Sequence, residues 1–200
     1  MSQPIDVILY FNFRSPYCYL ASKTLWPVVD GYNVNLIWKP VGGWNLRSSP
    51  DRAKKKVPLA RQDVARFARR LQIPLNPPPM ETETTKAAVL SLLAEEQGVL
   101  REYIVSVMDK EWAEGQNIGE QEILFSAGER AGLHRDDMQA ALDNPDYMQT
   151  LEDNVVEADE RGVIGVPTFL IGDQIFWGQD RIEFVLEELD QLTAAQEQSS

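Results

Sequence analysis

The sequence predicts an α/β fold in which a small domain of strands and helices is interrupted by a large all-helical insertion. Three observations support this prediction. The chain opens with a strand, helix and strand pattern, a long middle stretch from about Lys54 to Arg161 shows only helical patterns, and strand patterns return after Gly165. A length of 200 residues accommodates one such interrupted domain.

The first unit of the chain runs from a strand through a helix to a second strand. Asp6 to Phe13 is rich in Val, Ile, Tyr and Phe, which favour strands. Ser15 is a suitable N-cap and Pro16 a suitable first residue for the helix that follows, and Pro27 is expected to end it. Asn33 to Val41 predicts the second strand. A strand–helix–strand unit of this length makes the two strands parallel.

The middle of the chain predicts six helices separated by turns. Glycine and asparagine residues lie between the helical patterns, and Pro74 to Pro79 (PLNPPP) predicts a stiff loop. The expected helices are Val57–Leu71, Thr84–Glu96, Val99–Trp112, Glu120–Ala131, Arg135–Leu142 and Pro145–Arg161.

The last unit predicts a β-hairpin and a helix. Val166 to Ile171 and Gln174 to Trp177 are expected to form two strands joined by a Gly-Asp turn. An amphipathic helix follows from about Asp180 to Leu192. The order of strand, helix, strand, insertion, hairpin and helix is that of a thioredoxin-like fold. We therefore expect a thioredoxin-like domain formed by residues 1–53 and 162–200, and a helical insertion domain formed by residues 54–161.

Composition excludes several classes of function. A net charge of −12 argues against nucleic acid as a partner, because phosphate binding needs a basic surface. No apolar run approaches the roughly 18 residues of a membrane helix, and the MSQPID start does not resemble a signal peptide. The single cysteine excludes an internal disulfide and a multi-cysteine metal site. We expect a cytoplasmic protein with no membrane partner and no metal.

The segment SPYC, at residues 15 to 18, resembles a redox turn in which serine replaces the attacking cysteine. A helix N-terminus stabilises a thiolate, but the hydroxyl of Ser15 does not ionise near neutral pH. Ser15 can instead donate a hydrogen bond to a thiolate supplied from outside, which points to glutathione as a cofactor. The alternative is a plain N-cap. The lone His134 is interpreted as a helix-start or surface residue, so a serine hydrolase has little support.

A second segment, GVPTF at residues 165 to 169, strengthens the glutathione hypothesis. Pro167 occupies the place where thioredoxin-like proteins carry a cis-proline facing the active turn, and the backbone of Val166 can pair with an extended peptide there. Asp180 is either a helix cap or a partner for the γ-glutamyl ammonium. Cys18 has no partner thiol in the chain, so we interpret it as a buried core residue rather than a redox thiol.

Together these segments resemble a known family. SPYCYLAS, LQIPL at 71 to 75, EWAEG at 111 to 115, GVPTF and FWGQDR at 176 to 181 are similar to the 2-hydroxychromene-2-carboxylate isomerases, which in turn resemble kappa-class glutathione transferases within the DsbA-like group. The resemblance implies a thioredoxin domain with a helical insertion, a homodimer and glutathione as the cofactor. METETTK after the proline-rich loop and the segment from 42 to 56 depart from the family pattern.

The resemblance also implies roles for particular residues. Ser15 is the expected catalytic residue, facing the glutathione sulfur. Trp112 and Lys56 are expected to contact the substrate. The expected glutathione-binding residues are Ser15, Asn45, Lys56, Val166, Pro167, Gln179 and Asp180.

The function predicted on this basis is glutathione-dependent isomerisation of an unsaturated aromatic carboxylate such as 2-hydroxychromene-2-carboxylate. Reversible addition of glutathione thiolate to a double bond would allow rotation before elimination. The alternatives are a kappa-like glutathione transferase or peroxidase, a DsbA-like thiol oxidoreductase, and a glutathione-binding module without catalysis. The oxidoreductase needs two thiols, and the chain has one.

Overall fold

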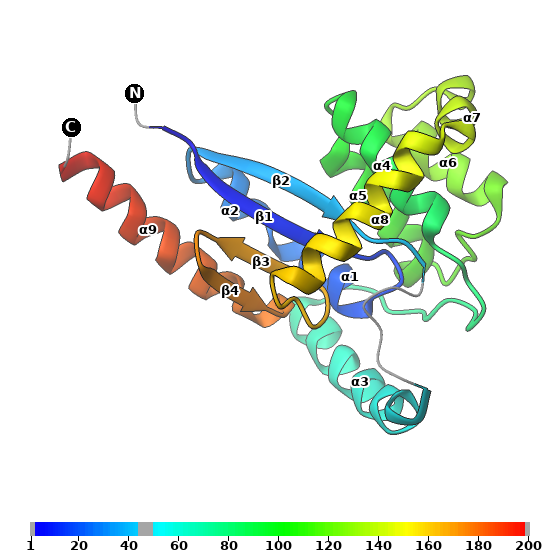
Figure 1. The fold of residues 1–200 in the computed structure, drawn as a ribbon. Helices are drawn as coiled ribbons and strands as arrows, with labels where there is room; N and C mark the ends of the chain where they lie inside the picture. Colours follow the sequence, from blue (N-terminus) through cyan, green and yellow to red (C-terminus); the bar gives the residue numbers. More distant parts are fainter. Residues whose placement is uncertain (1–2, 44–49, 199–200) are drawn as a thin grey trace.

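A computed structural model describes residues 3–43 and 50–198 of the chain. A four-stranded sheet lies at its centre with helices on both faces (Figure 1). In chain order the elements are β1 (Ile5–Phe11), α1 (Pro16–Thr24), α2 (Trp26–Asp30), β2 (Val34–Pro40), α3 (Pro50–Leu71), α4 (Thr85–Glu96), α5 (Leu100–Met108), the π-helix η1 (Asp109–Ala113), α6 (Gln121–Ala131), α7 (Arg135–Asp143), α8 (Pro145–Glu160), β3 (Thr168–Ile171), β4 (Gln174–Trp177), the 3₁₀ helix η2 (Gln179–Arg181) and α9 (Ile182–Gln198).

The strand order is β2-β1-β3-β4, so β1 is paired on both sides. It runs parallel to β2 along its whole length, from Ile5 opposite Val34 to Phe11 opposite Pro40. It runs antiparallel to β3, where Tyr10 lies opposite Thr168. The parallel pair predicted from the first unit and the hairpin predicted from the last are both confirmed.

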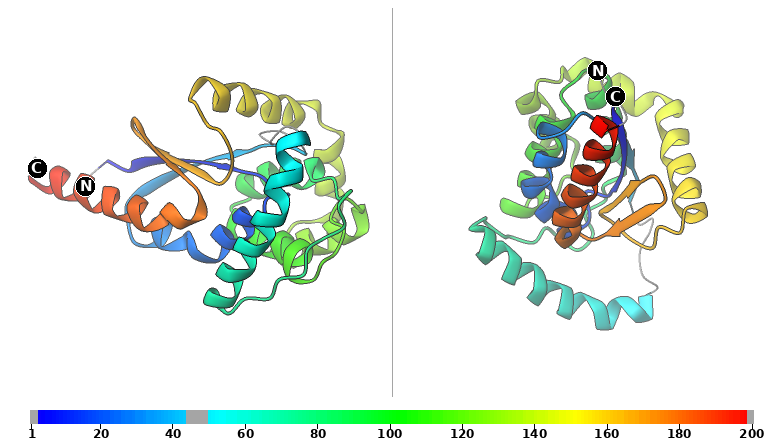
Figure 2. Two further views of the ribbon diagram at one scale, coloured as in Figure 1. Left: turned by 90° about the horizontal axis from the view of Figure 1, so that it is seen from below. Right: turned by 90° about the vertical axis from the view of Figure 1, so that its left-hand side faces the viewer.

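The alternation of β1 divides the core into two layers, because successive side chains of a strand point to opposite faces. Val7, Leu9 and Phe11 join the large cluster that includes α1, α4 and α5. Ile8 and Tyr10 join a smaller cluster with residues of α8 and β3. Figure 2 shows α8 on the side of the sheet opposite to α1 and α2.

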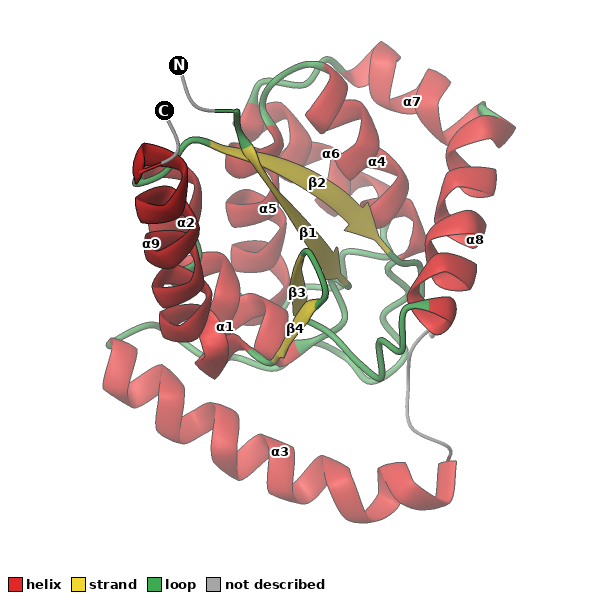
Figure 3. Ribbon diagram, turned by 60° about the vertical axis from the view of Figure 1, so that its left-hand side comes forward, coloured by secondary structure: helices red, strands yellow, loops and turns green. Residues whose placement is uncertain are grey.

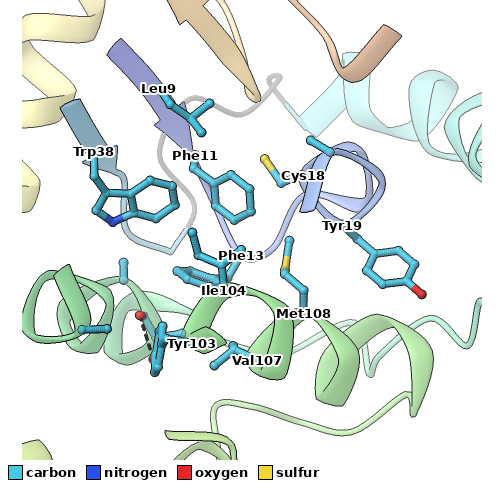
Figure 4. Close-up of a cluster of buried hydrophobic side chains, with 14 of the residues drawn as sticks. Leu9, Phe11, Phe13, Cys18, Tyr19, Trp38, Tyr103, Ile104, Val107 and Met108 are labelled. Carbon is cyan, nitrogen blue, oxygen red and sulfur yellow. Dashed lines mark hydrogen bonds between the residues drawn. The ribbon is translucent and has the colours of Figure 1, made fainter. Parts of the chain in front are cut away.

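The large cluster joins the sheet to the inserted helices. The ring of Phe11 lies 5.0 Å from that of Trp38 on β2 and 5.4 Å from that of Phe13, and Phe13 lies 5.9 Å from Tyr103 on α5 (Figure 4). The indole of Trp38 donates a buried hydrogen bond of 2.9 Å to Ser91 on α4. Because aromatic side chains bury large apolar areas, these contacts stabilise the packing of the inserted helices against the strands.

The helical segments predicted for the insertion are confirmed with shifted ends. Helix α3 begins at Pro50 rather than at Val57, and it contains Pro58. Its first turns carry a mostly charged sequence with no apolar periodicity, which is why the pattern did not reveal them. The helix predicted to reach Trp112 changes to the π-helix η1 after Met108. The boundaries proposed at residues 53/54 and 161/162 stay a prediction.

Two expectations for the first unit were wrong in detail. Pro27 does not stop the helical structure: it lies in the first turn of the short helix α2, where its missing N–H costs nothing. Strand β1 ends at Phe11 rather than at Phe13, because a backbone hydrogen bond of 3.0 Å from Ser15 N–H to the Asn12 carbonyl turns the chain there.

The difference in burial between two leucines predicts different losses of stability when each is replaced by alanine. Leu90 on α4 is fully buried, whereas Leu59 on α3 is 66% exposed. We expect Leu90→Ala to lower the free energy of unfolding by about 2–5 kcal/mol, because it leaves a cavity between the sheet and the helices. The same change at Leu59 serves as the control, with an expected effect of about 0.5 kcal/mol or less. Denaturant titration measures both, and equal losses would contradict this description of the core.

Candidate active site

Ser15 lies at the N-terminus of α1 and caps it as predicted. Its backbone is extended (φ −87°, ψ 121°), and its Oγ accepts a hydrogen bond of 3.3 Å from the Cys18 N–H. The same hydroxyl donates a hydrogen bond of 3.3 Å to the Val166 carbonyl, 151 residues further along the chain. The half-buried serine hydroxyl therefore lies between the positive end of a helix and the loop that precedes β3.

The loop opposite Ser15 has the geometry expected from its sequence. The Val166–Pro167 peptide bond is cis, as predicted. The Pro167 carbonyl accepts a hydrogen bond of 2.9 Å from the Gly178 N–H, which ties the loop to the start of η2. Gly165 lies close to Trp177: an added Cβ would be 2.9 Å from the indole nitrogen, so a side chain at position 165 would require the indole to move.

Side-chain hydrogen bonds stabilise the turn between β1 and α1, residues 12–15. Asn12 accepts a hydrogen bond of 2.8 Å from the Arg14 N–H and donates one of 3.1 Å to the Gly43 carbonyl. Trp112 donates a buried hydrogen bond of 3.1 Å from its indole to the Phe13 carbonyl, and its side chain is only 7% exposed. The structure thus places Trp112 beneath the turn, where it supports the backbone that leads to Ser15.

Cys18 is a core residue, consistent with its interpretation from the sequence. It is fully buried, its sulfur points into the aromatic cluster (Figure 4), and it accepts a hydrogen bond of 3.5 Å from the Asn12 N–H. Burial raises the pKa of its thiol to about 12, which outweighs the opposing effects of the hydrogen bonds from Asn12 and Ser15. The thiol therefore stays protonated at neutral pH and is a poor nucleophile.

A groove of ≈ 370 Å³ lies between α1 and α3 beside the turn. Figure 3 shows α3 as a long helix that runs along one side of the molecule. Tyr17 lines the groove from α1, and Lys56, Asp63 and Arg66 line it from α3. Tyr17 donates a hydrogen bond of 3.1 Å to Asp63. Burial raises the pKa of Tyr17 to about 12, with further contributions from the negative charges of Asp63 and Asp180. Asp180 is therefore close enough to act electrostatically on the groove.

Gln179 and Asp180, the two predicted site residues that follow the hairpin, have different environments. Gln179 is buried, with 6% of its surface exposed, whereas Asp180 is exposed and forms an ion pair of 2.9 Å with Arg181. Gly178 precedes them with a φ of 116°, a conformation that favours glycine. Among these residues, the carboxylate of Asp180 is the group presented to solvent near α1.

The structure brings together most of the residues predicted to form the site. Ser15 contacts Val166 directly, Pro167 follows it, and Lys56 lies across the groove on α3. Asn45 falls outside the described residues.

Three residues near the turn were not singled out from the sequence. Tyr17 follows the serine-proline pair and lines the groove, Arg14 precedes it, and Glu111 is a fully buried carboxyl group in η1. Glu111 stood inside the EWAEG segment, but a glutamate near a helix end ordinarily predicts a solvated residue. Its burial depends on how α5 continues into η1, which no local pattern encodes.

Comparison with known proteins agrees with this architecture. The family model described as a DSBA-like thioredoxin domain matches residues 6–190.

The chain belongs to the DsbA-like thioredoxin domain family. It is 25% identical over 193 residues to a 2-hydroxychromene-2-carboxylate isomerase from Sphingobium xenophagum, covering 92% of this chain and 97% of the relative. It is 27% identical over 189 residues to an isomerase of the same name from Pseudomonas putida, covering 90% and 92%. The predicted resemblance is thereby confirmed.

A solved structure of 2-hydroxychromene-2-carboxylate isomerase superimposes with a TM-score of 0.82 at 23% identity, covering 98% of this chain and 100% of that one. The thioredoxin-like fold with helices between its two halves is confirmed. Within residues 3–43 and 50–198, no helix is both long and apolar enough to cross a membrane.

The environment of Cys18 predicts low reactivity toward thiol reagents. At pH 8 we expect the native protein to react with Ellman's reagent at least about 100-fold more slowly than free cysteine, because the thiol is both buried and protonated. Guanidinium chloride should restore full reactivity by exposing the side chain. Release of the coloured thiolate measures both rates, and reaction of the folded protein at the rate of free cysteine would contradict the buried position.

Proposed function

We propose that this protein is a glutathione-dependent isomerase of an unsaturated aromatic carboxylate such as 2-hydroxychromene-2-carboxylate, working in the cytoplasm. The names of its relatives support an isomerase activity. The observation that carries the proposal is the position of the Ser15 hydroxyl, between the N-terminus of α1 and the backbone of Val166. When bound, glutathione would supply a thiolate able to add reversibly to an electron-poor double bond.

The residues of the site fit a thiol tripeptide. The hydroxyl of Ser15 makes only a long hydrogen bond to Val166, so it can turn toward a thiolate and donate a charge-assisted bond instead. The helix N-terminus adds favourable charge at the same point. The backbone of Val166, before the strand β3, supports pairing with an extended peptide. Asp180 supplies the negative charge that a γ-glutamyl ammonium requires.

We propose roles for the remaining residues from their positions. Lys56 brings a positive charge to the groove between α1 and α3, which suits a substrate carboxylate or enolate. We assign Gln179 and Pro167 to shaping the glutathione site and Trp112 to supporting its floor. Asn45 lies outside the described residues, and its proposed role in glutathione binding rests on the family resemblance alone.

Three alternatives make different predictions from the isomerase. A kappa-like transferase or peroxidase would use the same thiolate but consume glutathione, whereas an isomerase returns it after each turnover. A DsbA-like thiol oxidoreductase is disfavoured because Cys18, the single cysteine of the chain, is buried and protonated. A binding module without catalysis would bind glutathione and turn over no activated alkene.

Removing the Ser15 hydroxyl tests the proposal. We expect Ser15→Ala to lower the rate of glutathione-dependent isomerisation of a chromene carboxylate by about 100-fold, because one donor to the thiolate is lost. Ser126→Ala is the matched control, since Ser126 is an exposed serine on α6. Absorbance of the substrate measures the rate, and assay of free thiol before and after turnover measures consumption of glutathione.

Three outcomes would count against the proposal. Full activity in Ser15→Ala would remove the serine from the chemistry. Loss of free thiol in step with product would favour the transferase. Absence of turnover despite glutathione binding would favour the binding module.

We further propose that the protein is a homodimer. Four large apolar side chains are about half exposed or more and lie around the edge strand β4: Ile164, Ile175, Trp177 and Phe184. Trp177 lies against Gly165 in the loop before β3, and α9 packs against β4. An edge strand with exposed apolar side chains is unusual for a monomer, and covering it with a second copy would remove this apolar surface from water.

Charge introduced on this edge tests the dimer. We expect light scattering of the wild-type protein to give twice the chain mass, and Ile175→Asp to weaken self-association by at least about 10-fold, because a buried unpaired charge is costly. Val156→Asp is the control, because Val156 is 59% exposed on α8. A wild-type protein that stays at the mass of one chain at all concentrations would overturn the proposal.

A further inference from the structure

Helix α3 carries a charge opposite in sign to that of the rest of the protein. Its 22 residues include eight lysines and arginines and two aspartates, which give the helix a net charge of +6. Because the whole chain carries −12, the residues outside α3 together carry −18. A small anion is therefore repelled by most of the protein and attracted at α3.

Close ion pairs within the helix do not neutralise this charge. Arg66 keeps 62% of its side chain exposed, and its Nη1 lies 4.0 Å from Oδ1 of Asp63. Lys54 is 80% exposed and lies 3.6 Å from Asp51. Exposed pairs at such distances contribute little to stability. A charged helix face of this kind is ordinarily solvated, so the charge of α3 alone assigns no binding site.

The groove between α1 and α3 gives part of this charge a definite place. Its volume of ≈ 370 Å³ falls within the range of about 300–1,000 Å³ that is usual for small-molecule sites. Tyr17 and Leu59, which is 66% exposed, supply apolar lining. Lys56 and Arg66 are the first and last residues of α3 that line it, and ten helical positions place them about 15 Å apart. The groove therefore combines apolar walls with a cation towards each end.

The carboxylates at the groove already have partners. Asp63 accepts a hydrogen bond of 3.1 Å from the Tyr17 hydroxyl. Asp180, which acts electrostatically on Tyr17, forms an ion pair of 2.9 Å with Arg181. The 4.0 Å between Asp63 and Arg66 is too long for a hydrogen bond. The guanidinium of Arg66 therefore has donors available for a bidentate bond to a carboxylate from outside.

We propose that this groove binds small aromatic carboxylates and that Arg66 selects them by pairing with the carboxylate group. The aromatic ring lies against Tyr17 and Leu59, and Lys56 adds a second positive charge. A neutral compound of the same shape makes the apolar contacts but leaves Arg66 without its anion. The proposal rests on the proposed function for the reaction that the bound compound undergoes. Binding in the groove itself is measurable without glutathione and without turnover.

Two probes of the same shape separate charge from apolar contact. 2-Naphthoate carries a carboxylate on a two-ring aromatic system, and 2-naphthamide is its neutral counterpart. Isothermal titration calorimetry of the full chain gives the dissociation constant of each. We expect the wild-type protein to bind naphthoate more tightly than naphthamide, and raising the salt concentration from about 20 mM to about 500 mM should reduce this preference by screening the charges.

Replacing Arg66 tests its role in the preference. We expect Arg66→Gln to weaken naphthoate binding about fivefold and to leave naphthamide binding unchanged, because one exposed charge contact is lost. Arg66→Lys keeps the positive charge and should retain most of the naphthoate affinity. Arg69→Gln is the matched control: it makes the same change three residues along α3, at an exposed arginine that does not line the groove. It should leave both affinities unchanged.

Four results would overturn the proposal. They are equal affinity of the wild type for the two probes, absence of saturable naphthoate binding, equal effects of the glutamine substitutions at Arg66 and Arg69, and displacement of naphthoate from the wild type by glutathione. The last would assign the groove to a carboxylate of glutathione instead. Naphthoate binding as expected in a protein that catalyses no isomerisation would count against the proposed function alone.

Discussion

The pairing of β1 on both sides is the constraint on which the site depends. Its parallel pairing with β2 fixes the direction of β1, whose carboxyl end leads into the turn before α1. Its antiparallel pairing with β3 brings the start of β3 to this same end of β1. Tyr10 opposite Thr168 fixes this register, so Ser15 and Val166 meet although 151 residues separate them. A shift of the β1 register by one residue would turn every side chain of β1 to the other face of the sheet. The burial of its alternating side chains therefore fixes the register on which the site depends.

The inserted helices do more than cover the sheet. Tyr103 packs against Phe13 and Trp112 donates to its carbonyl, so these helices form the floor of the turn, and α3 forms the wall of the neighbouring groove. This floor is apolar apart from Arg14, Glu111 and the network around Asn12, so charges near it act strongly on one another. The result is a site that can favour an anion at the helix N-terminus while keeping its own thiol, Cys18, protonated.

The sequence predicted the parts of the fold that depend on local pattern. The alternation of β1, the serine and proline at the start of α1, and the proline before β3 each have a short-range physical cause, and the structure confirms them. It did not predict α2, because Pro27 serves equally as the end of one helix and the beginning of another. The buried positions of Trp112 and Glu111 were also missed, since they depend on how η1 packs under a turn distant in the chain.

In the proposed function, Ser15 and the N-terminus of α1 hold an external thiol as a thiolate. Titration of glutathione bound to the wild-type protein, followed by thiolate absorbance, tests it most directly. We expect the bound thiol to ionise about two pH units below the ordinary value near 8.5, with tight binding retained above that pH. A bound thiol that titrates at the same pH as free glutathione would show that Ser15 and the helix N-terminus do not stabilise the thiolate.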